Sequence, residues 1–273
     1  MTRLMSSARL LRRRLMYAFS RRSIVTHSFL GEPLRVTIAD PTARDWYARQ
    51  LPTASEMLKA RDHGLHEGAL VFDLGAHQAV IALMLSRIVG PAGRVIAVEP
   101  DPHSYRIANS NRILNEASNM TVIHAAASDT AGTSLFGLGF GSSGSVALAV
   151  AGGHPQVEVP CVTVDDLVAE YGFPDVVYVD VEGFEQRVLM GATQTLRRRS
   201  TTWVVEVHVG CGLEASGGSA AEVLAYFPSG EYDVYVKHPD PHRRDELIPL
   251  SELGRELDYH CNIVAAPRVI PQQ

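Results

Sequence analysis

The chain has 273 residues, of which 46% are hydrophobic, so it is long enough to bury a large core. Its formal net charge of −5 argues against a protein that binds nucleic acid through a positive surface, and we expect no nucleic-acid partner. The three cysteines are widely spaced, which argues against a disulfide framework or a zinc knuckle and fits a reducing cytoplasm.

The first 35 residues are strongly basic, with eight arginines and a single acid, Glu32. Such a segment is typical of an amphipathic helix on an anionic membrane surface, of an organelle transit peptide, or of a plain basic tail. No apolar run in the chain approaches the roughly 20 residues that span a bilayer. We assign residues 1–35 to a basic N-terminal extension and residues 36–273 to one α/β domain. We expect a cytoplasmic protein, with peripheral membrane contact through the extension left open.

Helix and strand patterns alternate along the first half of the main domain. They predict a helix over 54–66, a buried strand over 69–74, a helix over 79–89, a buried strand over 94–98, a helix over 104–115 and a strand over 120–125. This alternation implies right-handed crossovers and a parallel sheet that is covered on both faces.

The alternation is interrupted between Gly132 and Gly153, where the chain is rich in Gly and Ser. We expect an irregular or hairpin excursion over one end of the sheet, either a binding loop or a structural hairpin. Beyond it the pattern predicts strands over 157–164, 175–179 and 202–207, helices over 165–171, 184–197 and 219–227, and a closing strand pair over 232–237 and 261–266. Asp165 is predicted to be a helix N-cap.

Acidic residues end the first two strands of the predicted sheet, Asp73 in one and Glu99 in the next. In open α/β sheets, ligands bind at this edge, beside the point where the strand order reverses. A carboxylate such as Glu99 can accept hydrogen bonds from ribose hydroxyls, whereas Asp73 suits a ligand ammonium better than a pyrophosphate. The loop lacks the full glycine fingerprint of dinucleotide sites. The pair predicts a nucleoside site, with candidate residues Asp73, Gly75, Ala76, His77, Glu99 and Pro100.

Six short motifs, taken in order, resemble the FkbM-type methyltransferases. They are Asp73-Leu-Gly-Ala-His77, Glu99-Pro100, Ala127-Ser128-Asp129, Val164-Asp165-Asp166-Leu167, Asp180-Val-Glu182-Gly183-Phe-Glu185 and Glu206-Val-His208. The resemblance covers residues 54–267, and the Asp180 block followed by Glu-x-His is its most specific part. It implies an S-adenosylmethionine-dependent O-methyltransferase, commonly acting on sugar or polyketide hydroxyls, in which Ser128, Asp129 and Asp180 also contact the cofactor.

The resemblance also implies the fold. Residues 36–273 would form a class I methyltransferase domain, a doubly wound, Rossmann-like sheet that is mostly parallel with an antiparallel last strand. Three positions depart from the family pattern: His77 replaces a usual Asn, Ala79 a usual Gly and Tyr178 a frequent Lys. Ala79 is still small enough for close helix approach, and His77 can replace an amide donor. No role of the lysine can be transferred.

Three further residues at the same sheet edge are candidates for catalysis, namely Asp180, Glu206 and His208. Methyl transfer to a hydroxyl needs aligned reactants and removal of the acceptor's proton. The three side chains would either bind Mg²⁺, by analogy with catechol-type methyltransferases, or supply His208 as the general base. A plain strand-end histidine is the structural alternative. Glu182 and Glu185 begin the next helix, where its dipole stabilises acids.

The acceptor is expected to be a small molecule or a glycan with a free hydroxyl, and homo-oligomer formation is left open. Two other functions compete with O-methylation. One is an NAD-type oxidoreductase. The other is a non-catalytic, membrane-associated protein on a degenerate methyltransferase fold, which draws on the departures at His77, Ala79 and Tyr178 and on the basic extension.

Overall fold

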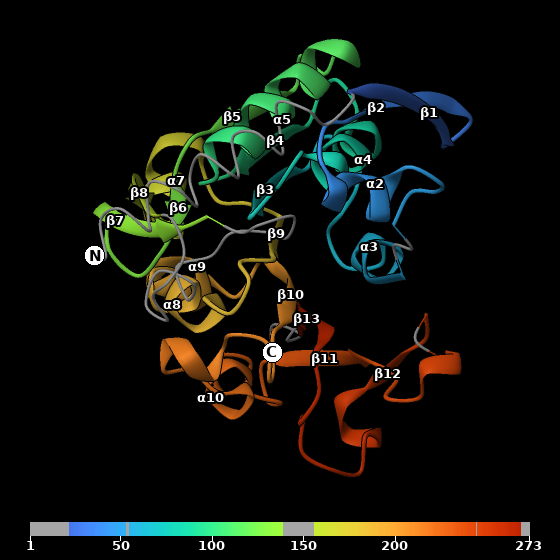
Figure 1. Ribbon diagram of the computed structural model, residues 1–273. Coiled ribbons are helices and arrows are strands. Elements are labelled where there is room, and N and C mark those ends of the chain that lie inside the picture. The colour runs from blue at the N-terminus through green and yellow to red at the C-terminus, as the bar shows by residue number, and fades with distance from the viewer. Residues whose placement is uncertain (1–21, 53–54, 139–155, 244, 269–273) are drawn as a thin grey trace.

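An eight-stranded sheet forms the centre of the computed structural model, which describes residues 22–52, 55–138, 156–243 and 245–268 (Figure 1). The strand order is β12-β11-β13-β10-β9-β3-β4-β5. The strands are β3 (Leu70–Leu74), β4 (Arg94–Val98), β5 (Met120–Ile123), β9 (Val176–Val179), β10 (Thr202–Val207), β11 (Tyr232–Lys237), β12 (Leu247–Pro249) and β13 (Cys261–Pro267).

Strands β10, β9, β3, β4 and β5 are parallel, whereas β13 runs antiparallel between β10 and β11. Strand β12 adds an antiparallel edge beyond β11. The chain fills the sheet outward from β3 to β5 and then returns to place β9 on the other side of β3. This confirms the predicted doubly wound sheet and its antiparallel last strand. The strand order reverses between β3 and β9.

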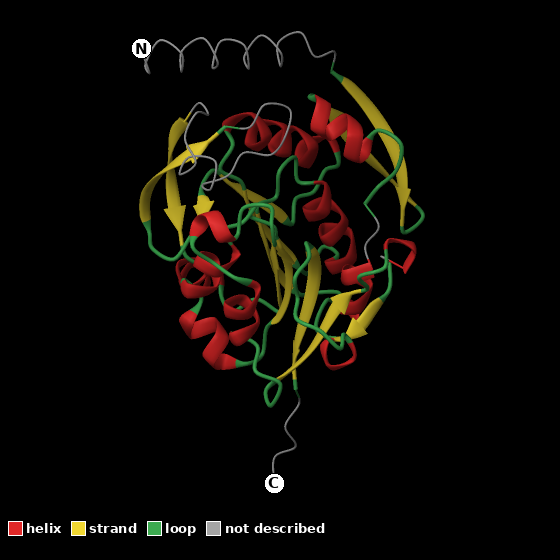
Figure 2. Ribbon diagram, turned by 60° about the horizontal axis from the view of Figure 1, so that its bottom comes forward, coloured by secondary structure: helices red, strands yellow, loops and turns green. Residues whose placement is uncertain are grey.

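Helices cover both faces of this sheet (Figure 2). Because alternate side chains of a strand point to opposite faces, Val71 packs into one core and Phe72 into the other. The first core is covered by α2 (Pro41–Tyr47), α3 (Ser55–Arg61), α4 (Val80–Val89) and α5 (Pro102–Leu114). The second is covered mainly by α7 (Val164–Tyr171), α8 (Glu185–Met190) and α10 (Ala220–Ala225), with α9 (Thr193–Arg198) beside α7.

Three helix predictions need correction. The helix expected over 54–66 ends at Arg61, before a turn that contains Gly64. The helix expected over 184–197 is divided into α8 and α9, because Gly191 lies so close to the backbone of Ser128 that a Cβ would meet its carbonyl oxygen at 2.3 Å. The N-cap of α7 is Thr163, and Asp165 instead accepts hydrogen bonds from backbone N–H groups at the start of α9.

Two small sheets flank the central one, on opposite sides of the molecule (Figures 1 and 2). One is the hairpin of β1 (Ser23–Phe29) and β2 (Glu32–Ile38), which the sequence did not predict. Strand β2 passes through position 35, where we placed the domain boundary, and its Leu34, Val36 and Ile38 are buried in the first core. The amide side chains of Asn111 on α5 and of Asn115 at its C-cap bond the backbone of β2.

The other small sheet contains β6 (Ala126–Ala127), β7 (Gly132–Gly137) and β8 (Gln156–Val162), in the order β6-β8-β7. Strands β7 and β8 pair antiparallel, but β8 lies beyond the expected excursion, so the choice between a binding loop and a structural hairpin stays a prediction. Residues 139–155, which include most of the expected loop, lie outside the described residues. So do residues 1–21, to which the helix, transit-peptide and tail interpretations apply. None of the helices in the described ranges has the length and apolar character needed to cross a membrane.

Candidate active site

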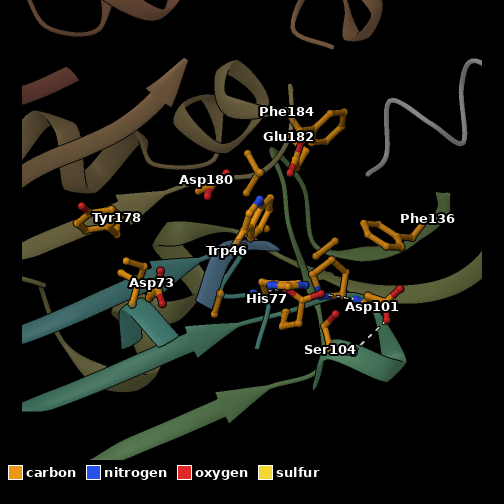
Figure 3. A pocket seen from close by; sticks show the side chains of 18 of the residues that line it. Trp46, Asp73, His77, Asp101, Ser104, Phe136, Tyr178, Asp180, Glu182 and Phe184 are labelled. Atoms are coloured by element: carbon orange, nitrogen blue, oxygen red, sulfur yellow. Dashed lines mark hydrogen bonds between the residues drawn. The ribbon is translucent and has the colours of Figure 1, made fainter. Parts of the chain in front are cut away.

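A pocket opens at the carboxyl ends of β3, β4 and β9, where the strand order reverses (Figure 3). It brings together seven of the residues predicted for the cofactor, namely Asp73, Gly75, Ala76, His77, Glu99, Pro100 and Asp180. The remaining two lie outside it. Ser128 donates a hydrogen bond to Asp129, and Asp129 forms an ion pair with Arg187 on α8 at 2.9 Å.

Glu99 is held rigidly at the end of β4. The backbone N–H of His77 donates to its Oε2 and that of Asp101 to its Oε1, both at 2.7 Å. Burial, together with the charge of Asp101, raises the pKa of Glu99 well above its ordinary value, although these two hydrogen bonds oppose the shift. Each oxygen of the carboxylate keeps a further lone pair. The pocket therefore presents an oriented acceptor for hydroxyl groups.

Asp73 is buried at the end of β3, with only 2% of its surface exposed. Its Oδ2 has no hydrogen-bond partner among the described residues. Burial raises the pKa of Asp73 to about 7. Since an unpaired buried carboxylate is unfavourable, this position is suited to a cationic group from a ligand.

Gly75 follows β3 and links it to the part of the pocket that contains Asp180. Its φ is +90°, and a Cβ added there would lie 1.8 Å from the carbonyl oxygen of Asp180. Only glycine permits this approach. The turn after β3 is therefore in direct backbone contact with the end of β9.

The two unusual loop residues both have left-handed backbones, with φ +50° at His77 and +61° at Ala79. Ala79 is the N-cap of α4, so a position where the family usually has glycine keeps the conformation that glycine favours. The backbone N–H of His77 bonds Glu99, as that of any residue could, and replacement of an amide donor by the His77 ring stays a prediction. Burial lowers the pKa of the His77 ring, and its Nδ1 has no partner in the described part of the chain.

Aromatic side chains that the sequence analysis missed form part of the pocket wall. Trp46 on α2 lies between Asp180 and His77, with its ring centroid 5.3 Å from that of His77 (Figure 3). Phe136 on β7 and Phe184 also line the pocket, as does Tyr178 on β9. Helix α2 has only seven residues and thus no periodic pattern, so only the short Asp40-Pro41 cap signal was available for it.

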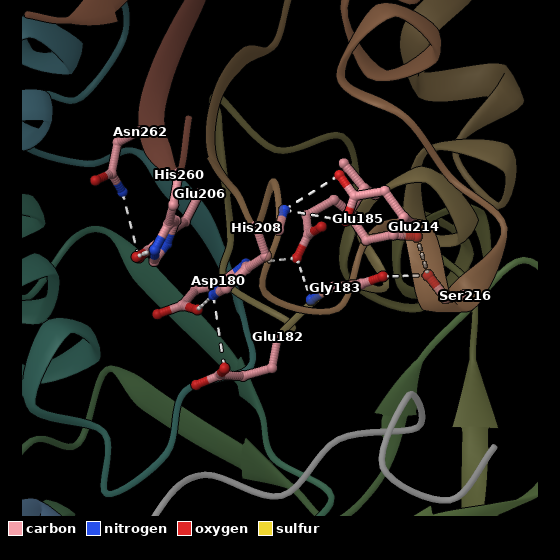
Figure 4. Close-up of polar contacts among 12 residues, drawn as sticks. Asp180, Glu182, Gly183, Glu185, Glu206, His208, Glu214, Ser216, His260 and Asn262 are labelled. Atoms are coloured by element: carbon pink, nitrogen blue, oxygen red, sulfur yellow. Dashed lines mark hydrogen bonds and ion pairs between the residues drawn. The ribbon is translucent and has the colours of Figure 1, made fainter. Parts of the chain in front are cut away.

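His208 does not line this pocket but lies next to two residues that do, Asp180 and Glu182 (Figure 4). Its Nδ1 bonds Oε1 of the buried Glu185 at 2.8 Å, and its Nε2 faces Asp180 Oδ1 at 3.7 Å and Glu182 Oε2 at 3.6 Å. Burial alone would lower the pKa of His208, but the hydrogen bond and charge of Glu185, followed by the charge of Asp180, raise it to about 10. Desolvation by the surrounding protein and the charge of Glu206 raise the pKa of Asp180 well above its ordinary value.

Glu206 faces a different neighbour. Its Oε1 lies 2.7 Å from Nε2 of His260, which directly precedes β13, the strand paired with β10. The His260 ring stacks on that of His208, with the ring centroids 4.5 Å apart. Burial tends to raise the pKa of Glu206, but the hydrogen bond from His260 and the charge of His208 lower it overall. The predicted trio is thus divided into two potential ligand groups that share His208, one with Asp180 and Glu182 and one with Glu206 and His260.

Comparison with known proteins identifies a family for the chain. The sequence model of the methyltransferase FkbM domain matches residues 73–234, while no curated protein sequence matches the chain. Among solved structures, the chain is similar to the FkbM methyltransferase of Methylobacillus flagellatus, at 16% identity and a TM-score of 0.47 over 72% of this chain and 43% of that one. It therefore spans less than half of that protein.

Two other similar structures cover more of the chain. One is an S-adenosylmethionine-dependent O-methyltransferase of Thermotoga maritima, at 13% identity and a TM-score of 0.43 over 92% of this chain and 79% of that one. The other is fibrillarin of Aeropyrum pernix, solved with S-adenosylmethionine. It has 17% identity and a TM-score of 0.46 over 92% of this chain and 86% of that one. Because the domain model covers more than half of its residues, the chain belongs to the FkbM family of methyltransferases.

Proposed function

We propose that the protein transfers a methyl group from S-adenosylmethionine to a hydroxyl of a sugar, glycolipid or polyketide-type acceptor. One observation carries the proposal: carboxylates from three neighbouring strand ends, Asp73, Glu99 and Asp180, line a single pocket. The family assignment supports methyl transfer and argues against a nicotinamide-dependent oxidoreductase.

The described residues fit the cofactor. Glu99 would accept hydrogen bonds from ribose hydroxyls, since two backbone N–H groups already orient its carboxylate. The unpaired Oδ2 of Asp73 would face the ammonium of the methionine part. When bound, S-adenosylmethionine supplies an electrophilic methyl group on a positively charged sulfur.

The acceptor would lie between Asp180 and the aromatic wall. Trp46, Phe136 and Phe184 offer apolar faces to a sugar ring or a polyketide. Asp180 is the one predicted catalytic residue that lines the pocket, so we assign to it the proton of the acceptor hydroxyl. His208 and Glu206 do not line the pocket and are positioning residues in this proposal.

Calorimetric titration of the full chain tests the cofactor step. We expect S-adenosylhomocysteine to bind at one site per chain, and NAD not to bind. Glu99→Gln should weaken binding at least about tenfold, because its amide NH₂ would face a backbone N–H. The exposed Glu252→Gln is the matched control. Failure of S-adenosylhomocysteine to bind at millimolar concentration would remove the proposal and favour a non-catalytic protein.

Labelled S-adenosylmethionine tests the acceptor class. Incubation with panels of hydroxylated glycans, glycolipids and polyketides should label at least one panel, and the label should be lost with Asp180→Asn. Transfer to nucleic acid, or to amine acceptors alone, would contradict O-methylation.

A further inference from the structure

We propose that Asp180, Glu182 and His208 form a binding site for a divalent transition-metal ion, such as Mn²⁺ or Zn²⁺, at the acceptor side of the pocket. The role of this ion in orienting an acceptor hydroxyl rests on the proposed methyltransferase function. Binding of the ion itself is independent of that function. The site differs from the predicted magnesium trio, since Glu182 takes the place of Glu206.

The spacing of the three side chains suits a metal better than hydrogen bonds. Nε2 of His208 is 3.7 Å from Oδ1 of Asp180 and 3.6 Å from Oε2 of Glu182, and potential ligand atoms of all three lie within 4.8 Å of one another (Figure 4). These distances exceed those of good hydrogen bonds. Ligands that bind at about 2.1 Å in a tetrahedral site lie about 3.4 Å apart.

The far side of the imidazole is arranged as in a metal-bound histidine. Nδ1 of His208 bonds Oε1 of Glu185 at 2.8 Å, and the backbone N–H of Gly183 donates to the same oxygen at 2.7 Å. The side chain of His208 is 4% exposed and that of Glu185 is 0% exposed. A buried carboxylate on one ring nitrogen fixes the ring and aims the other nitrogen at the ion. Here that nitrogen is aimed at Asp180 and Glu182.

The single ring of His208 cannot balance all the carboxylates around it, even when it carries a proton. Asp180, Glu182 and Glu185 all face this one ring, and their only ion pairs within the described ranges are with it, not with a lysine or an arginine. A divalent ion would offset this excess of negative charge. Imidazole as a ligand favours Zn²⁺ over Mg²⁺, which prefers oxygen, and the two carboxylates also suit Mn²⁺.

The second group around His208 is less suitable, because its members already satisfy one another. Glu206 and His260 form a close pair at 2.7 Å, and Asn262 contacts the other oxygen of Glu206. Asp180 and Glu182, in contrast, are 41% and 33% exposed and line the pocket. An ion held by three protein ligands there keeps positions open for an acceptor oxygen.

Titration of the full chain with Mn²⁺, followed by electron paramagnetic resonance, tests the site. We expect one bound Mn²⁺ per chain, displaced by Zn²⁺. Asp180→Asn, Glu182→Gln and His208→Gln should each weaken binding at least about tenfold, and Glu185→Gln about tenfold, since outer carboxylates contribute that much to metal affinity. His66→Gln, an exposed histidine before β3, is the matched control. Glu182 is partly exposed, so Glu182→Gln should fold, as circular dichroism would verify.

Three results would overturn the metal site. They are no binding of Mn²⁺ or Zn²⁺ at millimolar concentration, binding that survives Glu182→Gln, and binding that is lost with His260→Gln but not with Asp180→Asn. Calorimetry with S-adenosylhomocysteine separates the two proposals. Mn²⁺ binding without S-adenosylhomocysteine binding leaves the metal site and removes the methyltransferase function, and the converse result leaves the function and removes the metal site.

Discussion

Asp73 shows how a single residue can serve ligand binding at the expense of stability. Its carboxyl has a pKa of about 7 in the folded chain, against an ordinary value of 3.8, because it is buried. The unfolded chain therefore loses the Asp73 proton at a lower pH than the folded chain does. As a result, the free energy of unfolding falls as the pH rises from about 4 to about 7. Above about pH 7 the carboxylate is charged in both states, and the full free-energy cost of burying that charge is present.

Replacing Asp73 by Asn should therefore stabilise the protein at pH 8 and weaken the cofactor. We expect a gain of roughly 1–3 kcal/mol in the free energy of unfolding at pH 8, and a smaller gain at pH 5. Denaturant unfolding at both pH values measures it. Calorimetry should show that S-adenosylhomocysteine loses at least about tenfold in affinity. Equal or greater stability of the wild type at pH 8 would contradict the assignment.

The residues of the site were predictable where strand ends carry them. Asp73, Glu99 and Asp180 follow apolar strands, and parallel strands place their carboxyl ends at one edge. The sequence could not show that Glu206 turns toward His260, because that depends on how β10 pairs with β13. Nor could it show Trp46, which reaches the pocket from a distant short helix.

At the level of elements, the turn after β3 depends on Gly75. Gly75→Ala would place a methyl group against the carbonyl oxygen of Asp180 in a left-handed backbone. We expect a loss of roughly 3 kcal/mol or more in the free energy of unfolding, together with loss of S-adenosylhomocysteine binding. Thermal melting measures the loss of stability, and calorimetry measures the loss of S-adenosylhomocysteine binding. Gly230→Ala, where a Cβ meets no atom within 4 Å, should change neither.

The hairpin β1–β2 depends on Asn111 of α5 and on Asn115 at the C-cap of that helix. Asn115 accepts from the N–H of Arg35 and donates to its carbonyl, so its amide acts like a neighbouring strand. Asn115→Ala should cost roughly 1–3 kcal/mol and speed hydrogen exchange in residues 32–38. Asn109→Ala, on the same helix, should leave that exchange unchanged, because its amide bonds only Tyr105. Unaltered exchange in both variants would show that the hairpin is held by its apolar side chains alone.

The central elements were predictable because their strands are buried on both faces and read as apolar runs. Strands β4 and β10 have the predicted bounds. So does β11, although most of its side chains are only half-buried. The hairpin was missed because the arginine-rich residues 1–22 precede it directly, so residues 23–35 were assigned with them to a basic extension, although Leu34, Val36 and Ile38 alternate as in a strand that is buried on one face. The divided helix α8–α9 was missed because the contact of Gly191 with Ser128 is long-range.

For the whole molecule, the basic extension and the folded domain should act separately. Strand β1 begins at Ser23, so removing residues 1–22 leaves the hairpin intact. We expect the truncated chain to keep its affinity for S-adenosylhomocysteine and to lose binding to anionic vesicles. Vesicle co-sedimentation and calorimetry measure the two properties. Vesicle binding that persists would show that the extension is not the membrane contact.

The approach of Gly75 to Asp180 also has a consequence for the order of events during turnover. The loop that would hold the cofactor and the residue that would take the acceptor's proton share one backbone contact, so a shift of the loop toward Asp180 would displace Asp180 as well. Binding on one side is then energetically coupled to binding on the other, and such coupling is reciprocal. Cofactor and acceptor should raise each other's affinity by the same factor, with the cofactor shaping the acceptor site before chemistry begins.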